Sequence, residues 1–174
     1  MARKGRKGET MAIANLPGVS TLGMKLGYAI ETTPGTAPTE YLWLQRANTI
    51  GGIDLTTETI DASAIEDAIE RAIAGRQGTG GEWTFSFNLT NETRPIYQKM
   101  LDDSNAALVE NKRTWFTVWS PKLDYAFFIV AQPGGKIPMP GIDQNALLVA
   151  ELTLALDEYK GLMTPAIEPK DETA

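Results

Sequence analysis

The sequence predicts a mainly β domain, a β-sandwich or barrel with one flanking α-helix. Apolar and polar residues alternate along several short segments, and turns rich in glycine and proline separate these segments. This pattern, with one well-marked helix, does not fit a βαβ fold. The 174 residues, 43% of them hydrophobic, suffice for one core with appendages but not for two full domains.

The chain begins with a basic segment, 1–19, that we expect to form a flexible arm. Its basic residues are Arg3, Lys4, Arg6 and Lys7, and its one acid is Glu9. The arm therefore carries a net charge of +3 and the rest of the chain −9, which together give the −6 of the whole chain. An acidic body argues against tight binding of a phosphate backbone, whereas the arm alone could touch nucleic acid or serve only as a solubilising leader.

Alternation predicts the first strands of the domain. In 24–31 one face holds the apolar residues Met24, Leu26, Tyr28 and Ile30. A loop rich in threonine and proline, 32–39, separates this strand from a short apolar segment, 41–44. The segment 53–60 again has a strand-like composition because threonine and isoleucine dominate it.

The clearest strand is 82–89, which we expect to anchor the core. One of its faces holds four large apolar side chains, those of Trp83, Phe85, Phe87 and Leu89. Each stabilises the fold by roughly 1.5 to 3 kcal/mol when it is fully buried. The best helix follows at 93–102, with Thr93 as its expected cap and an apolar stripe of Ile96, Tyr97, Met100 and Leu101.

Three more strands are predicted in the C-terminal half. The segments 114–120 and 125–131 flank a turn, 121–124, and are apolar on both faces. That composition indicates either central burial or an outward face that a neighbour covers. After a loop rich in glycine and proline, 132–141, the last strand, 148–157, has leucine and alanine on one face.

The segment 61–75 admits two interpretations. Its apolar residues Ile65, Ala68, Ile69, Ala72 and Ile73 fall at helical spacing, so periodicity alone favours a helix. The same residues also fit an extended hairpin.

Three stretches of the sequence resemble the major tail tube proteins of long-tailed, siphovirus-like bacteriophages. They are the run 58–67 (ETIDASAIED), the segment 72–75 (AIAG), and the run 79–88 (TGGEWTFSFN). An early segment, 23–36 (GMKLGYAIETTPGT), and a terminal strand before an acidic end are also similar to that family. The likeness covers roughly 20–160 and depends on the order of these stretches more than on any one motif.

The resemblance implies a tail-tube β-domain at 20–160, between the arm 1–19 and a C-terminal tail, 161–174. Such subunits close into six-membered rings that stack into a tube, and double-stranded DNA passes through the tube on ejection. The segment 61–75 then belongs to a long stacking hairpin or loop. Candidate inter-ring contacts are the basic arm residues Arg3, Lys4, Arg6 and Lys7, and the hairpin residues Ile65, Glu66, Asp67, Ile69, Arg71 and Ile73. Implied partners are copies of the chain and the tape measure, terminator and tip proteins of a virion tail.

The residue types present argue against catalysis. The chain has no histidine and no cysteine, so the usual general base near neutral pH and any thiolate nucleophile or metal ligand are missing. We therefore expect no enzyme, no cofactor and no metal site. A run of about 18 apolar residues, as a membrane span needs, is also missing, and no signal peptide is visible. We expect assembly in the host cytoplasm and no membrane contact.

Acidic residues dominate the polar faces of the predicted strands. Six acids, Glu31 among them, stand there against Lys25 as the one base. A wall that lets DNA pass must not bind phosphate, so an acidic or neutral lining is expected. The candidate lumen-lining acids are Asp54, Glu58, Glu82, Glu151 and Asp157. An ordinary solvated strand face would have the same composition.

A ligand- or carbohydrate-binding β-module is the alternative function. Trp43, Trp83, Trp115 or Trp119 would then form a stacking platform. Trp83 fits the core better than a platform, whereas Trp115 and Trp119 share one strand face that could be exposed.

Overall fold

A computed structural model describes residues 18–171 of the chain. The basic residues predicted to form the arm, Arg3, Lys4, Arg6 and Lys7, lie outside the described part. The described part contains nine strands and one helix. They are β1 (Lys25–Ile30), β2 (Leu42–Leu44), β3 (Ala47–Ile50), β4 (Thr56–Asp61), β5 (Ala72–Gly78), β6 (Glu82–Asn88), α1 (Thr93–Val109), β7 (Thr114–Trp119), β8 (Ala126–Gln132) and β9 (Val149–Met163).

Seven of the strands form one antiparallel sheet in the order β2-β1-β7-β8-β9-β6-β3. The sheet curves so strongly that β6 and β7, which have β8 and β9 between them in the strand order, face each other across the core. The ring centroids of Trp83 on β6 and Phe116 on β7 are 5.4 Å apart. The predicted mainly β fold is confirmed, but the sheet does not close into a barrel, because β2 and β3 are its two edges.

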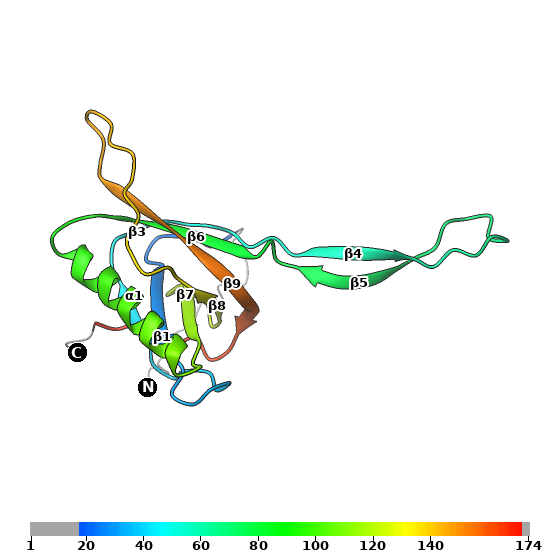
Figure 1. The fold of residues 1–174 in the computed structure, drawn as a ribbon, viewed down its shortest axis with the longest axis horizontal. Coiled ribbons are helices and arrows are strands. Elements are labelled where there is room, and N and C mark those ends of the chain that lie inside the picture. The colour runs from blue at the N-terminus through cyan, green and yellow to red at the C-terminus, as the bar shows by residue number, and fades with distance from the viewer. Residues whose placement is uncertain (1–17, 172–174) are drawn as a thin grey trace, which may run out of the picture.

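Helix α1 covers the inner face of this sheet (Figure 1). Tyr97, Met100 and Leu101 are fully buried, as the apolar stripe predicted, and the ring of Tyr97 stacks on that of Phe87 at 3.6 Å. The helix runs seven residues beyond the predicted end at 102, since Ser104 and Ala107 continue the buried stripe.

The predicted cap at Thr93 is wrong. Thr93 lies inside the helix, where its hydroxyl donates to the carbonyl oxygen of Asn88 at 2.7 Å. Thr90 takes the capping role, because its Oγ1 accepts hydrogen bonds from the backbone N–H groups of Glu92 and Thr93 at 3.2 and 3.1 Å.

Both faces of β7 and β8 are covered, so their two-sided apolar composition reflects central burial. Phe116 and Ile129 face the main core between the sheet and α1. Trp115 and Phe128 face the opposite side, where Tyr41 and the C-terminal residue Ile167 pack against them. The segment after β9 thus lies against the body, and its Lys170 pairs with Leu42 at the edge strand β2.

A missed strand, a longer last strand and a hairpin in place of a helix also differ from the sequence prediction. Strand β3 was not predicted, since its four residues include only one large apolar side chain. Strand β9 continues to Met163, well beyond the predicted end at 157. The periodicity that favoured a helix over 61–75 is misleading: β4 and β5 pair antiparallel there as a separate two-stranded sheet, with Ile60 opposite Ile73.

Candidate assembly surfaces

The β4–β5 hairpin projects from the body as a long ribbon (Figure 1). It has four exposed isoleucines, Ile60, Ile65, Ile69 and Ile73, and Ile69 is 78% exposed. A two-stranded hairpin alone is at best marginally stable in water, and exposed apolar clusters of this kind mark interaction sites. The hairpin is therefore a candidate contact surface for another chain.

The tip of the hairpin is ordered by its own polar side chains. The Asp61 carboxylate accepts from the backbone N–H of Ser63 at 2.8 Å, and hydrogen bonds with Ser63 hold the pKa of Asp61 below its usual value. Asp67 accepts from the N–H of Ala64 at 2.9 Å and lies 3.9 Å from the Arg71 guanidinium. These contacts leave Ile65 and Ile69 at the surface, so the tip presents a shaped apolar surface with acidic residues around it.

The shaft of the hairpin carries a narrow apolar strip. Ile60 and Ile73 face each other directly across the two strands, so their side chains share one face. A Cβ at Gly75 would lie 3.2 Å from the Ile60 side chain and 3.1 Å from the Glu58 carbonyl oxygen. Glycine at this position lets the Ile60 side chain lie flat over the neighbouring strand.

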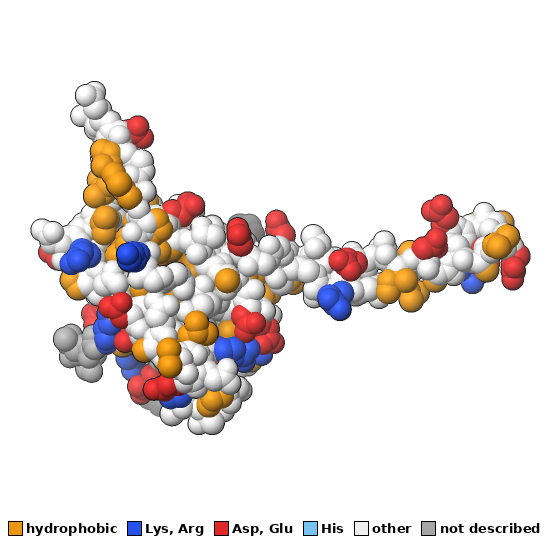
Figure 2. All heavy atoms as spheres, in the orientation of Figure 1, with side chains coloured by type: hydrophobic (Ala, Val, Ile, Leu, Met, Phe, Trp, Pro, Cys, Tyr) orange, Lys and Arg blue, Asp and Glu red, His pale blue; other side chains and the backbone are white. Residues whose placement is uncertain are grey.

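A second projection is formed by the loop 133–148 and the start of β9. Figure 2 shows hydrophobic side chains gathered along it. Its exposed apolar residues are Met139, Ile142, Leu147 and Leu148. The sequence pattern did not single them out, although five large apolar residues near three prolines and three glycines in 133–148 are more than a solvated loop needs.

The hairpin residues predicted as inter-ring contacts lie together, at the tip and outer part of the ribbon. Ile65, Glu66, Asp67 and Ile69 are in the tip, and Arg71 and Ile73 are at the point where it joins β5. The structure thus brings together six residues that the sequence had proposed for one surface, while the four arm residues lie outside the described part.

The five predicted lumen acids fall into two groups. Glu82, Glu151 and Asp157 lie on the exposed outer face of β6 and β9, where Glu82 pairs with Ala155 and Glu151 with Ser86. Asp54 precedes β4 and Glu58 lies within it, so both belong to the projection and its base.

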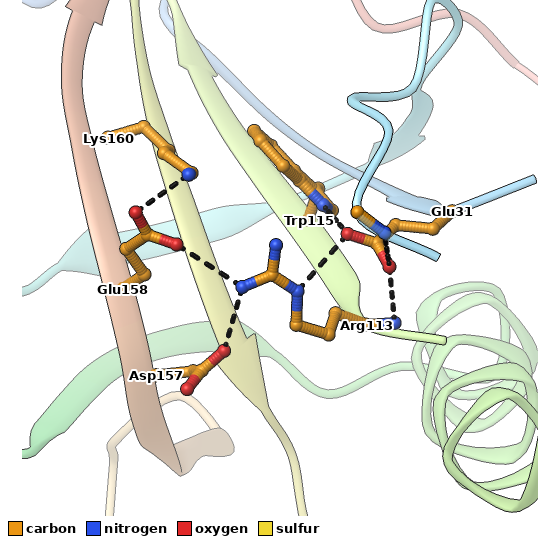
Figure 3. A network of polar contacts seen from close by, with 7 residues as sticks. Glu31, Arg113, Trp115, Asp157, Glu158 and Lys160 are labelled. Atoms are coloured by element: carbon orange, nitrogen blue, oxygen red, sulfur yellow. Dashed lines mark hydrogen bonds and ion pairs between the residues drawn. The ribbon is translucent and has the colours of Figure 1, made fainter. Parts of the chain in front are cut away.

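Asp157 is engaged in a network of polar contacts (Figure 3). The Arg113 guanidinium donates from Nη1 to Asp157 at 3.1 Å and to Glu158 at 3.2 Å, and from Nε to Glu31 at 3.2 Å. These acids raise the pKa of Arg113 even though its burial acts in the opposite direction. Part of the negative charge that the sequence predicted for this face is therefore neutralised by Arg113 within the chain.

Glu31 does not lie on a solvated strand face, contrary to the prediction from the sequence. It is 1% exposed and accepts from Trp115 Nε1 at 2.8 Å and from the backbone N–H groups of Arg113 and Gly35 at 3.0 and 3.2 Å. Burial acts to raise its pKa, but these donors and the Arg113 charge outweigh it and hold the pKa below the usual value. Glu31 is a buried anion that fixes the loop after β1 to the start of β7.

The structure argues against a tryptophan stacking platform. Trp83 and Trp115 are 1% and 4% exposed, so the expectation that Trp115 could lie at the surface is wrong. Trp43 and Trp119 are half-buried, and the Lys25 ammonium lies 4.5 and 5.6 Å from their ring centroids. None of the four rings is free to stack on a sugar without moving other groups.

Residues 18–171 contain neither a cluster of metal ligands nor a helix that could cross a membrane. This part of the chain has no group of three or more acidic residues placed to hold a metal ion. It also has no helix with the length and apolar character that crossing a membrane requires.

No protein-family model matches the chain, and no curated protein matches it in sequence. Its fold is similar to that of a chain in a solved structure described as the cryo-EM structure of the anti-feeding prophage baseplate, six-fold symmetrised. The two align with a TM-score of 0.56 over 85% of this chain and 96% of that chain. Their identity is 14%, so the similarity is one of fold.

Proposed function

We propose that the chain is a structural subunit of a phage-type tail that assembles with copies of itself into stacked rings. The observation that carries the proposal is the β4–β5 hairpin, whose isoleucines are exposed on a ribbon that projects from the body. Burying them against a neighbouring copy stabilises the assembly by about 25 cal/mol for each Å² of apolar surface removed from water. The hairpin is then the contact between successive rings.

The fold similarity supports six subunits in each ring. The similar chain belongs to a baseplate described as six-fold symmetrised. If copies of this chain assemble with the same symmetry, they form a six-membered ring in which every subunit uses the same surface. The second apolar projection, which contains Ile142 and Leu147, is a candidate for the contact within the ring.

The outer face of β6 and β9 fits the wall of a DNA conduit. Glu82 and Glu151 are exposed there, and Arg113, which reaches Asp157 on that face, is neutralised by Glu31, Asp157 and Glu158. Such a wall repels phosphate groups and does not retain them. We infer a tail tube through which double-stranded DNA passes without specific binding.

On this proposal the protein is a virion component and has no catalytic role. Its permanent partners are copies of itself, and the tape measure, terminator and tip proteins bind the ends or the inside of the tube. Assembly takes place in the cytoplasm of the bacterial host.

Sedimentation velocity over a range of concentrations tests the proposal. The double variant Ile65→Asp, Ile69→Asp should sediment as a small species at concentrations where the natural chain forms large particles, because two charges would have to be buried in each contact. The matched control is Leu108→Asp, Val109→Asp, since both residues are exposed at the end of α1 and the control adds the same two charges. Equal assembly of the hairpin variant and the control would contradict the proposed role of the hairpin.

A further inference from the structure

A cleft of about 580 Å³ lies along the seam where the curved sheet fails to close. On one side of it are β3 and the residues that follow, including Ile50 and Ile53. On the other side are the start of β1, the end of β7 and the start of β8, including Leu26, Val118 and Phe127. The cleft opens onto the main core, because Leu26 and Val118 are members of the buried cluster.

The described residues that line the cleft are suited to an apolar occupant. None of them is charged, and the largest side chains are apolar or aromatic, among them Met24, Trp83 and Ile129. Its volume lies in the range of about 300–1,000 Å³ that is typical of binding pockets, whereas protein interiors hold few voids larger than a water molecule. Apolar side chains that fill the cleft would remove both their own surface and its walls from water, which is favourable.

The second projection, beside the start of β9, has matching chemistry. Its residues Met139 and Ile142 are 84% and 72% exposed, so they make little contact with their own chain. They belong to the stretch 137–142, which reads Ile-Pro-Met-Pro-Gly-Ile and contains no charge. The two prolines have no N–H group, so the stretch brings fewer backbone donors that burial would leave unpaired.

The tip of the β4–β5 hairpin is a poorer match for the cleft. Glu66, Asp67 and Glu70 accompany its exposed isoleucines. A buried carboxylate is costly unless it is paired, and the described lining of the cleft includes no lysine and no arginine to pair with it. Of the two apolar projections, the uncharged one therefore fits the cleft.

The occupant comes from a second copy, because the projection and the cleft lie at different places on the domain. The projection points away from the body and joins β9 at Val149 (Figure 1). Tyr159, which lines the cleft, is ten residues further along β9, or roughly 33 Å of extended strand. Each copy thus has one projection to insert and one cleft to receive, and a contact between two different surfaces closes into a ring when the rotation allows it.

We propose that Met139 and Ile142 of one copy fill the seam cleft of the neighbouring copy in the ring. The inference rests on the proposed function, which requires a contact between the subunits of one ring, and it adds where that contact lies. The free edge of β3 favours it further. Within residues 18–171, β3 pairs with β6 on one side only, so backbone groups on its other side can hydrogen-bond to the entering stretch.

Engineered cysteines test the proposal, because the natural chain contains none. Chains with Ile53→Cys are mixed in concentrated solution with chains that have Met139→Cys or Ile142→Cys. Mild oxidation should link the two kinds of chain in at least one of these mixtures, since a disulfide requires Cβ atoms about 3.5–4.5 Å apart. In the control mixtures Val109→Cys replaces Ile53→Cys; Val109 is 89% exposed and lies outside the cleft, so the yield of linked chains should be several-fold lower.

A double variant tests whether the projection fills the cleft of its own chain. The variant Ile53→Cys, Ile142→Cys should keep both thiols when it is oxidised in dilute solution, where chains rarely meet. A disulfide formed within one chain would assign the cleft to that chain's own projection and overturn the proposal.

Sedimentation of the same mixtures under reducing conditions separates this contact from the proposed function. Large particles whose crosslink yield does not exceed the control would overturn the docking of the projection and leave the tail assembly standing. A specific crosslink in rings that do not stack would support the docking and contradict the stacking. Chains that stay monomeric and give no specific crosslink would overturn both.

Discussion

Replacing the buried Glu31 by glutamine should be among the most damaging single substitutions in this domain. Each of its two carboxylate oxygens accepts two hydrogen bonds. Oε1 accepts from Arg113 Nε and Trp115 Nε1, and Oε2 accepts from the backbone N–H groups of Gly35 and Arg113. Glutamine offers one oxygen and one NH₂ group in the same place, so in either orientation two donors face an NH₂ group.

The expected loss of stability follows from the number of donors left without an acceptor. A buried donor left without an acceptor costs about 1–3 kcal/mol, so two of them cost about 2–6 kcal/mol. The matched control is Asp157→Asn, which removes a carboxylate charge from the same network. The Asp157 side chain is 56% exposed, so its ion pair with Arg113 contributes at most about 1 kcal/mol.

Urea unfolding of dilute protein at pH 7, followed by far-ultraviolet circular dichroism, measures both losses. The free energy of unfolding should fall by about 2–6 kcal/mol for Glu31→Gln and by under about 1 kcal/mol for Asp157→Asn. If the two variants lost the same small amount, the interpretation of Glu31 as a fully satisfied buried anion would be refuted.

Three further predictions concern stability. Because the pKa of Glu31 is lower in the folded state, its contribution to the free energy of unfolding should be complete above its unfolded pKa of about 4.3 and disappear as the pH falls through the folded value. Urea titrations between pH 3 and 7 should therefore show the free energies of unfolding of the natural chain and Glu31→Gln converging in acid. A constant difference between them would contradict this. Phe85→Ala, which empties a site among three aromatic rings, should cost about 3–5 kcal/mol in the same assay, and a loss under 1 kcal/mol would contradict the assigned core. Gly27→Val would place a Cβ 2.7 Å from Pro169, so it should cost about 1–3 kcal/mol and make residues near 169 more sensitive to protease, whereas unchanged proteolysis would show that this contact does not hold the segment.

The core of the fold was predictable because its signals are local. Strand β6 alternates large aromatic and polar residues with period two, and helix α1 has its apolar stripe at period 3.6. Both patterns report which side of an element meets the core, so Phe85, Tyr97 and Leu101 were assigned to the core correctly. The surplus of apolar residues on β7 and β8 indicated either central burial or an outward face that a neighbour covers, and the structure shows burial on both faces.

The hairpin was not predictable from periodicity, because isoleucines at spacings of three and four fit a helix equally well. In the structure Ile65 and Ile69 lie in the turn region, where no regular period applies, and Ile73 lies on a strand. The residues also fit an extended hairpin, but only the resemblance to tail tube proteins favoured it over a helix. The isoleucines do not face a core of their own chain, so the usual link between pattern and burial is missing.

Long-range contacts account for the remaining differences. Glu31 is polar and follows a strand, so its sequence suggests solvent, but residues 82 and 84 positions further along the chain bury and bind it. Strand β9 passes its predicted end because β8 pairs with it as far as Met163. Trp115 is covered by C-terminal residues such as Ile167, which no local pattern reveals.

Negative-stain electron microscopy of the concentrated natural chain, beside the Ile65→Asp, Ile69→Asp variant, tests the central claim most directly. The account predicts six-fold rings stacked into tubes for the natural chain, and no tubes for the variant even though its domain stays folded. A natural chain that remains monomeric at every concentration, or a variant that forms the same tubes, would contradict the claim that the exposed hairpin holds an assembly together.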